Sequence, residues 1–334
     1  MNWIAGKSPI AFPGLGFTIN PAEGITIGPL TINFYGMIIA LGLMLAVIYG
    51  WKRAKDFGIK NDDITDGVLW IVPVAVVCAR AYYCIFEWDQ YAADPISVFY
   101  IWKGGLAIYG GVIGAAIGVA IFAKCKKISL PALLDLVALG FLIGQSIGRW
   151  GNFFNREAFG AQTNWFLRMG LNLTADRDYS AEMLYYHPTF LYESLWNAAG
   201  FVMLHFLSKK RKYDGQIALG YVAWYGLGRA LIEGLRTDSL YIGPFRVSQL
   251  LAAVSCFAAV VVLIIMLFKE HTPGKLFVNQ MAAAEETPAE EAEEETPAEE
   301  IVEETPAEEA PAEEETPAEE EIPAEETAEE ETEE

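Results

Sequence analysis

A dense group of polar side chains ends a long apolar stretch at residues 148–160, GRWGNFFNREAFG. Arg149 comes first, and Asn152, Asn155 and Glu157 follow it at helical or turn spacing. A guanidinium suits an anion such as phosphate because its planar fork donates two parallel hydrogen bonds and stays charged at every accessible pH. The group is too dense for simple anchoring of a helix end. It therefore predicts an anion-binding site.

The stretch 220–236, GYVAWYGLGRALIEGLR, carries a second polar group. In a helix Tyr225, Arg229 and Glu233 share one face at i, i+4 and i+8, and Arg236 lies three residues further on. Ionisable side chains inside a membrane span cost about 2.5–3.5 kcal/mol on insertion scales, so they normally face the bundle interior and pair with one another. Taken alone, this stripe is also explained by a structural Arg–Glu pair between helices.

The expected topology puts Arg149, Arg229, Glu233 and Arg236 in the outer half of the membrane, where they can converge. In a partly dry cleft, two arginines can hold the phosphodiester of an anionic lipid and stabilise the charge that it gains on leaving. Arg156 is interpreted differently, as a side chain that reaches out to the lipid headgroups.

The elements that must position these residues are helices. Seven apolar segments are long enough to span the hydrocarbon, which takes about 20 mostly apolar residues. They are approximately 30–51, 64–86, 105–124, 131–151, 188–208, 215–235 and 247–268. Basic clusters follow the first, third and fifth segments, which is the alternation of the positive-inside rule. The sequence predicts an all-α polytopic membrane protein with seven transmembrane helices, the N-terminus outside and the C-terminus cytoplasmic.

The acidic character of the chain belongs to its C-terminal end. Of 44 acidic residues, 26 are glutamates within residues 282–334, which leaves 18 acidic against 23 basic residues elsewhere. The repeated T-P-A-E-E motif repels itself and predicts a disordered cytoplasmic tail over 275–334. Residues 1–274 form the expected membrane domain, with an extracytoplasmic loop at about 152–187. The long apolar runs of this domain indicate a membrane protein and argue against a nucleic-acid partner.

Three further positions lie at the outer ends of the apolar segments. Tyr35 opens the first segment, and His187 precedes the fifth. Tyr109 lies one turn inside the third, where an aromatic residue of the membrane interface is unremarkable. The glycines that follow it recur at four-residue intervals, which predicts close helix packing: Gly110, Gly114 and Gly118.

The four cysteines are scattered through the apolar segments or at their ends: Cys78, Cys84, Cys125 and Cys256. Neither a C-x-x-C motif nor a histidine at metal-ligand spacing accompanies them. They are interpreted as small hydrophobic residues, and the sequence predicts no metal site.

The polar groups resemble the signature of the prolipoprotein diacylglyceryl transferases. The pattern G-R-x-G-N-F-x-N-x-E-x-x-G is met at every fixed position, by Gly148, Arg149, Gly151, Asn152, Phe153, Asn155, Glu157 and Gly160. Other blocks of that family follow in order, at Tyr35-Gly36, at 104–114, at His187-Pro188 with Leu191-Tyr192-Glu193, and at 225–236. The resemblance covers about residues 20–268.

The resemblance implies an enzyme of the bacterial plasma or inner membrane, with its active site toward the extracytoplasmic side. It implies transfer of the diacylglyceryl group of phosphatidylglycerol to the lipobox cysteine of a prolipoprotein signal peptide, among membrane lipids. The product is a thioether, glycerol phosphate leaves, and neither a metal nor an organic cofactor is needed. The residues suit this chemistry because a thiol with a pKa of about 8.5 becomes a thiolate when positive charge lies close by.

The resemblance also implies roles for individual residues. Arg149 binds the headgroup together with Asn152, Glu157 and Gly160. Arg229 is the second catalytic, phosphate-binding arginine, supported by Tyr225 and Glu233. The same blocks carry further residues that we assign to substrate binding: Tyr35, Asn155, Arg236 and His187.

One position departs from the family pattern. Well-known members have a block G-G-x-x-x-H-G-G whose histidine is proposed as general base, and this chain has Tyr109 there. A phenol with a pKa of about 10 is a poor base at neutral pH unless neighbouring arginines lower that value. The alternatives are a catalytic Tyr109, a Tyr109 that hydrogen-bonds the headgroup only, and His187 as a substitute base.

Two other classes of function compete with the enzyme. A transporter or flippase for an anionic solute or lipid would also use intramembrane arginines, but such folds usually contain inverted repeats or paired broken helices. The sequence shows no convincing internal repeat. A structural membrane scaffold that docks through its tail accounts for the tail and leaves the arginines unexplained.

Overall fold

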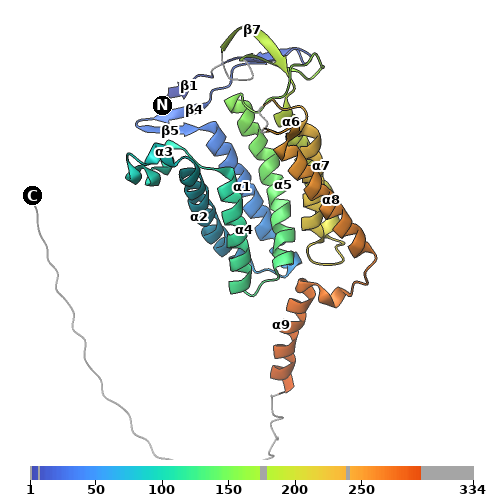
Figure 1. Ribbon diagram of the computed structural model, residues 1–334. Coiled ribbons are helices and arrows are strands. Elements are labelled where there is room, and N and C mark those ends of the chain that lie inside the picture. Colours follow the sequence, from blue (N-terminus) through green and yellow to red (C-terminus); the bar gives the residue numbers. More distant parts are fainter. Residues whose placement is uncertain (1, 7, 174–178, 238–240, 295–334) are drawn as a thin grey trace, which may run out of the picture. The chain divides into compact units, whose positions relative to one another are not determined.

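Within the residues that the computed structural model describes, 2–6, 8–173, 179–237 and 241–294, seven helices coincide with the seven apolar segments. Contacts divide the chain into residues 1–289 and 290–334, and these helices belong to the first unit (Figure 1). Their bounds are α1 (Phe34–Arg53), α2 (Asn61–Phe86), α4 (Ile108–Cys125), α5 (Leu130–Asn155), α6 (Thr189–Ser208), α7 (Gln216–Glu233) and α8 (Val247–Leu267). The prediction of a helix in each segment is confirmed.

In the described part of the chain, five of these helices are long and apolar enough to cross a membrane. They are α1 with the 3-10 turn that follows it (Phe34–Phe57), α2, α4, α5 and α8. The chain is therefore a mostly helical, polytopic membrane protein. Helices α6 and α7 are less apolar because they carry buried polar residues, among them Glu193 and Asn197 in α6 and Glu233 in α7.

The expectation of an all-α chain is wrong for the segments before and between the helices. Residues 24–33, GITIGPLTIN, form an antiparallel hairpin in which Gly28 takes a positive φ of 58° at the turn. The strands form three sheets, ordered β1-β4-β5, β3-β2-β6-β7 and β8-β9. Their bounds are β1 (Asn2–Ile4), β2 (Ile10–Phe12), β3 (Phe17–Ile19), β4 (Gly24–Ile27), β5 (Leu30–Asn33), β6 (Met169–Leu173), β7 (Tyr179–Tyr186), β8 (Tyr241–Ile242) and β9 (Phe245–Arg246).

Small residues let α2 and α4 pack closely, as the glycine spacing predicts. A side chain on Gly110 would collide with the Cys78 carbonyl, and one on Gly114 would collide with the Cys78 side chain. Gly118 faces Ile71 at ordinary contact distance. The predicted close packing is therefore confirmed, most strongly at the first two glycines.

Two tryptophans fix the register of α6 against α7. Trp196 Nε1 donates to the Trp224 carbonyl at 3.0 Å, and Trp224 Nε1 donates to the Trp196 carbonyl at 2.9 Å. The rings stack with centroids 4.4 Å apart. Trp196 lies over Gly228 and Trp224 over Gly200, where any side chain would collide. This double contact aligns the helix that carries Glu193 with the helix that carries Arg229 and Glu233.

A buried arginine in α2 organises the loop that leads into α4. Arg80 is 6% exposed and donates to four backbone carbonyls at 2.6–2.9 Å, those of Ser97, Val98, Gly104 and Gly105. This loop contains α3 (Trp88–Tyr91) and the 3-10 helices η2 (Pro95–Phe99) and η3 (Ile101–Lys103). Arg80 thus sets the position at which α4 begins, and sequence analysis does not single it out.

Two carboxylates accept backbone hydrogen bonds at the end of the bundle where α5 and α7 begin. Asp135, buried in α5, accepts hydrogen bonds from the backbone of Gly215 and Ala218 at 2.9 and 2.8 Å, and so caps α7. Asp214 accepts one from the backbone of Phe277 at 2.8 Å, where α9 (Phe277–Glu294) begins after η4 (Pro273–Lys275). Helix α9 lies in the segment for which the sequence predicts disorder, and 295–334 lie outside the described residues.

Arg156 is buried, so its interpretation as a headgroup-reaching side chain is wrong. It follows α5 in a left-handed conformation (φ 52°) and is 1% exposed. Its guanidinium donates to four acceptors at 2.6–2.9 Å and pairs with Glu23 at 3.4 Å. Those acceptors are the carbonyls of Ser8, Phe154 and Pro21 and Oδ1 of Asn20. Arg156 therefore ties the N-terminal strands to the end of α5.

Arg156→Lys keeps the charge and removes most of these donors. We expect amide hydrogen exchange over residues 8–33 to become at least about tenfold faster, because buried carbonyls lose their partners. Mass spectrometry of the detergent-solubilised protein measures this rate. Arg168→Lys is the matched control, since among the described residues Arg168 hydrogen-bonds only to the nearby carbonyls of Asn164 and Trp165 and otherwise lies over the Tyr185 ring. Unchanged exchange in Arg156→Lys would contradict the anchoring role.

Candidate active site

Three arginines converge on one buried carboxylate, that of Glu193. Arg149 Nη2 lies 2.6 Å from Glu193 Oε2, and Arg229 Nη1 lies 3.4 Å from the same oxygen. Arg236 Nη1 lies 3.3 Å from Glu193 Oε1. Arg229 Nη2 also pairs with Glu233 Oε2 at 2.6 Å. These five residues are called the Glu193 cluster below.

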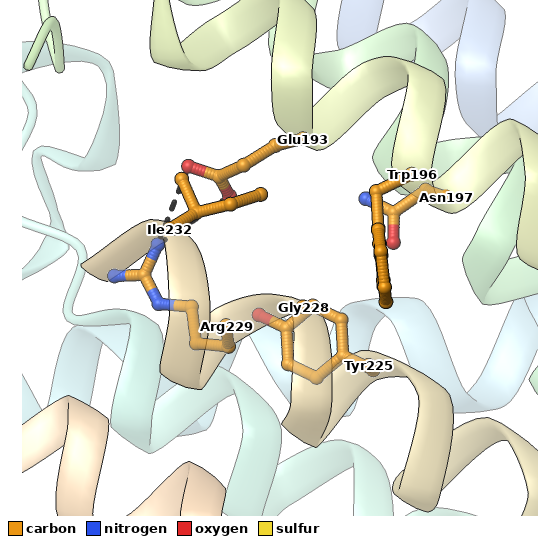
Figure 2. A pocket seen from close by; sticks show the side chains of 7 residues that line it. All are labelled: Glu193, Trp196, Asn197, Tyr225, Gly228, Arg229 and Ile232. Carbon is orange, nitrogen blue, oxygen red and sulfur yellow. Dashed lines mark hydrogen bonds and ion pairs between the residues drawn. The ribbon is translucent and has the colours of Figure 1, made fainter. Parts of the chain in front are cut away.

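Each member of the Glu193 cluster comes from an element that the fold holds in place. Arg149 lies near the end of α5, and Glu193 lies in the second turn of α6. Arg229 and Glu233 pair along α7 at i and i+4, and Arg236 follows α7 in a β-bridge with Gly160. Since α5 and α7 end where α6 begins, these side chains share one end of the bundle. Figure 2 shows Arg229 directed at Glu193.

Burial and charge together define what this cluster can bind. Glu193 and Glu233 are 4% and 1% exposed, whereas the side chains of the three arginines retain 10–21% exposure. Buried carboxylates need such partners because desolvation of an unpaired charge is costly. Three positive and two negative groups leave a net charge of +1. The cluster therefore suits a singly charged anion that approaches from the side where the arginines remain accessible.

The other signature residues lie beside Arg149. Asn152 Nδ2 donates to Glu157 Oε1 at 2.9 Å, and Asn155 Nδ2 donates to the same oxygen at 3.4 Å. Tyr35 of α1 packs against this end of α5, where the charges of Glu157 and Arg149 act on its hydroxyl. The structure thus gathers these predicted substrate-binding residues along one edge of the cluster.

Gly160 and His187 lie beside Arg236. The Gly160 amide donates to the His187 carbonyl at 2.9 Å, and a Cβ on Gly160 would lie 2.8 Å from His187 Cβ. His187 Nδ1 lies 3.2 Å from the Tyr192 hydroxyl. Burial lowers the pKa of His187, so the ring is neutral at neutral pH and can accept this hydrogen bond. Only glycine fits at position 160, where it pairs with Arg236.

Tyr109 stands apart from the Glu193 cluster. It lies in the first turn of α4, and its side chain is half exposed. Because α4 is connected directly to α5 and runs antiparallel to it, Tyr109 lies at the same end of the bundle as Arg149. Among the described residues its hydroxyl has no hydrogen-bond partner. The structure therefore does not join Tyr109 to the arginines.

A small cleft, with a volume of about 10 Å³, lies between α6 and α7 beside the cluster (Figure 2). Glu193 and Arg229 belong to both the cluster and the wall of the cleft. The remaining wall consists of Trp196, Asn197, Tyr225, Gly228 and Ile232. Tyr225, predicted as a substrate-binding residue, thus lies next to the arginines.

Glu193 is the central residue of the site, and sequence analysis assigns it no role. The sequence places Glu193 only at the outer end of the fifth apolar segment, within a block shared with the family. Counting the charges in the outer half of the membrane could have pointed to Glu193. Three arginines in the outer half of the membrane, with Glu233 as their one predicted partner, require a further acid, and Glu193 lies at the matching depth.

Comparison with known proteins identifies the family. Residues 23–265 match the profile described as prolipoprotein diacylglyceryl transferase. The chain belongs to this family. Similar proteins named phosphatidylglycerol–prolipoprotein diacylglyceryl transferase include that of Listeria monocytogenes serotype 4a (strain HCC23), which is 41% identical over 266 residues, 78% of this chain and 95% of the relative. That of Limosilactobacillus reuteri (strain DSM 20016) is 40% identical over 268 residues, 78% of this chain and 92% of the relative.

Membership of the prolipoprotein diacylglyceryl transferase family establishes the activity. The chain is a transferase that moves the diacylglyceryl group of phosphatidylglycerol to prolipoproteins, in lipoprotein biosynthesis. It is a multi-pass protein of the bacterial cell membrane. The family therefore decides for an enzyme over a transporter or a structural scaffold.

Glu193→Gln tests whether the central carboxylate aligns the arginines of this transferase. Glutamine keeps the shape and removes the charge, so the guanidiniums lose a shared partner and repel one another. We expect kcat for diacylglyceryl transfer to fall at least about tenfold, while KM for phosphatidylglycerol does not rise because the cluster becomes more positive. Initial rates over a range of donor concentrations give both constants.

Glu182→Gln is the control, because Glu182 is exposed on strand β7. Both constants should stay unchanged in this variant. An unchanged kcat in Glu193→Gln would show that the arginines do not need the carboxylate.

Proposed function

We propose that the Glu193 cluster binds the phosphodiester of phosphatidylglycerol at the extracytoplasmic face of the membrane. In this proposal all seven helices span the bilayer, with the N-terminus outside and the C-terminus in the cytoplasm. The basic clusters at 52–55, 124–127 and 209–212 support this orientation, because they lie at the end of the bundle opposite the Glu193 cluster. Residues 1–274 are the catalytic domain, and 275–334 form an acidic cytoplasmic tail.

One observation carries the proposal: guanidiniums from α5, α7 and the segment after α7 meet at one carboxylate and leave a net charge of +1. A phosphodiester carries one negative charge, so it matches this excess. Its two non-bridging oxygens also fit the parallel donors of an arginine. The arginines lie at the depth of a lipid headgroup, which makes an anionic phospholipid the natural ligand.

The reaction makes one C–S bond and breaks one C–O bond. The lipobox cysteine gives up its thiol proton, and its sulfur attacks the glyceryl carbon that bears the phosphate ester oxygen. Glycerol phosphate leaves with the bonding electron pair, and the thiol proton passes to solvent. The phosphate thereby gains a second negative charge. Arg149 and Arg229 stabilise that charge as it develops.

The residues around the arginines divide between the two substrates. Asn152, Asn155 and Glu157, with Tyr35, face the glycerol hydroxyls of the headgroup, for which they offer donors and acceptors. Tyr225 and Glu233 support Arg229. Arg236 binds the phosphate together with Arg149 and Arg229, and Gly160 holds Arg236 in place through its β-bridge. His187 shapes the entrance for the acceptor peptide.

Tyr109 meets the acceptor thiol in this proposal. Its hydroxyl is half exposed and lies at the same end of the bundle as the arginines. The positive charge of the cluster favours the thiolate, so the phenol needs only to orient the sulfur by donating a hydrogen bond to it.

Transfer of label from radiolabelled phosphatidylglycerol to a synthetic lipobox peptide tests these roles. We expect Arg149→Ala and Arg229→Ala each to lower kcat/KM by at least about a hundredfold, the typical loss for a group that stabilises transition-state charge. Tyr109→Phe should lower it about tenfold or more. Arg168→Ala, outside the cluster, is the control and should retain full activity.

Three outcomes would contradict the proposal. Transfer that needs neither arginine would exclude the phosphate site, and a serine acceptor labelled as well as cysteine would exclude thiol attack. Full activity in Tyr109→Phe would show that the tyrosine does not orient the thiol.

Deletion of residues 282–334 tests whether the acidic tail takes part in catalysis. We expect kcat/KM to stay within about twofold of the full chain, because the tail carries no group that the chemistry uses. The deletion leaves Phe277 in place, whose backbone bonds Asp214 and whose ring packs against the core. The same radiolabel assay measures the rate. A large loss of activity would assign the tail a catalytic role.

A further inference from the structure

A buried polar side chain without a partner faces the cleft between α6 and α7. Asn197 lies one helical turn beyond Glu193 on α6 and is 2% exposed. Among the described residues its carboxamide makes no hydrogen bond, although it lines the cleft. Buried amides are normally hydrogen-bonded, since an unpaired one carries the full cost of desolvation. The position therefore indicates a ligand group that hydrogen-bonds with Asn197.

Tyr225 of α7 faces the same cleft. Figure 2 shows Asn197 on the opposite side of the cleft from Arg229, and Tyr225 between them with its hydroxyl toward Arg229. The Tyr225 hydroxyl also has no hydrogen-bond partner in the described part of the chain. Its ring stacks on Tyr221 with centroids 5.7 Å apart, which fixes its direction. Two donors, a carboxamide and a phenol, thus line one cleft.

The depth of these two residues identifies the ligand group. Helix α6 enters the bundle from the cluster end, so Asn197 lies about 6 Å deeper than Glu193 at 1.5 Å per residue. Helix α7 runs the other way, and Tyr225 precedes Arg229 by the same four residues. In a phospholipid bound through its phosphate, the groups one turn deeper are the acyl esters of the glyceryl unit. An ester carbonyl only accepts hydrogen bonds, and both residues can donate.

We propose that Asn197 and Tyr225 bind an acyl ester carbonyl of the donor lipid. The proposal rests on the phosphate site at the Glu193 cluster and extends it into the membrane. With the phosphate held at Arg229 and the carbonyl at Asn197, the glyceryl carbon between them is fixed in orientation for attack by sulfur. The cleft is narrow and accommodates one small group such as a carbonyl oxygen. The enzyme therefore selects diacyl donors over donors with ether-linked chains.

The test compares diacyl phosphatidylglycerol with its dialkyl ether analogue, which lacks both carbonyl oxygens. We expect the wild-type enzyme to prefer the diester by at least about tenfold in kcat/KM. Asn197→Ala should lower kcat/KM for the diester by a similar factor and leave the diether value unchanged, which abolishes the preference. Tyr225→Phe should reduce the preference in the same way. If the diether is not turned over, its inhibition constant against the diester provides the comparison.

Asn61→Ala is the matched control, since the Asn61 side-chain oxygen is also buried and has no partner among the described residues, but lies at the opposite end of the bundle. This variant should keep the preference for the diester. Equal losses for both donors in Asn197→Ala, or a wild-type enzyme without preference, would overturn the inference. Failure of the phosphate site gives a different result, because Arg149→Ala would then retain transfer from either donor.

Discussion

The pairing of three guanidiniums with the Glu193 carboxylate is the interaction on which the rest of the site depends. Arginines this close together in a membrane protein repel one another strongly, because the surrounding medium screens charge poorly. Glu193 contacts all three within 3.4 Å and is itself almost fully buried. The carboxylate and the arginines therefore stabilise each other, and neither would be tolerated at this depth alone.

Such a cluster demands that α5, α6 and α7 keep a fixed register, and the fold contains separate devices for this purpose. The reciprocal hydrogen bonds of Trp196 and Trp224 align α6 with α7. Arg156 fixes the end of α5 against the N-terminal strands, and Gly160 holds Arg236 through a β-bridge. The acceptors or donors in these contacts are backbone groups, so a substitution such as Glu193→Gln leaves the contacts intact. Helices α6 and α7 are less apolar than the other helices, and these contacts help to hold them in the bundle.

The helices could be predicted from the sequence because their length and apolar content are local properties, and the basic clusters supply the orientation. The strands could not, since most of them have two to four residues and lie outside the long apolar segments. Arg80 and Arg156 escape sequence analysis for another reason. Their acceptors are mostly backbone carbonyls, which no residue type reveals, and Arg156 bonds Ser8 from 148 residues away. The arginines of the active site were recognisable by type and spacing, but their shared partner emerges only when α6 is placed beside α7.

If the Glu193 cluster binds the donor phosphate as we propose, its charge balance bears directly on catalysis. A site with three unpaired arginines would bind every anionic headgroup tightly and hold the doubly charged product even more strongly, which slows release. With Glu193 and Glu233 present the net charge is only +1, so the donor lipid shares the guanidiniums with two carboxylates. As the phosphate gains its second charge, the guanidiniums interact more strongly with it and less with Glu193. The interaction is then stronger in the transition state than in the bound donor, and this difference is what accelerates a reaction.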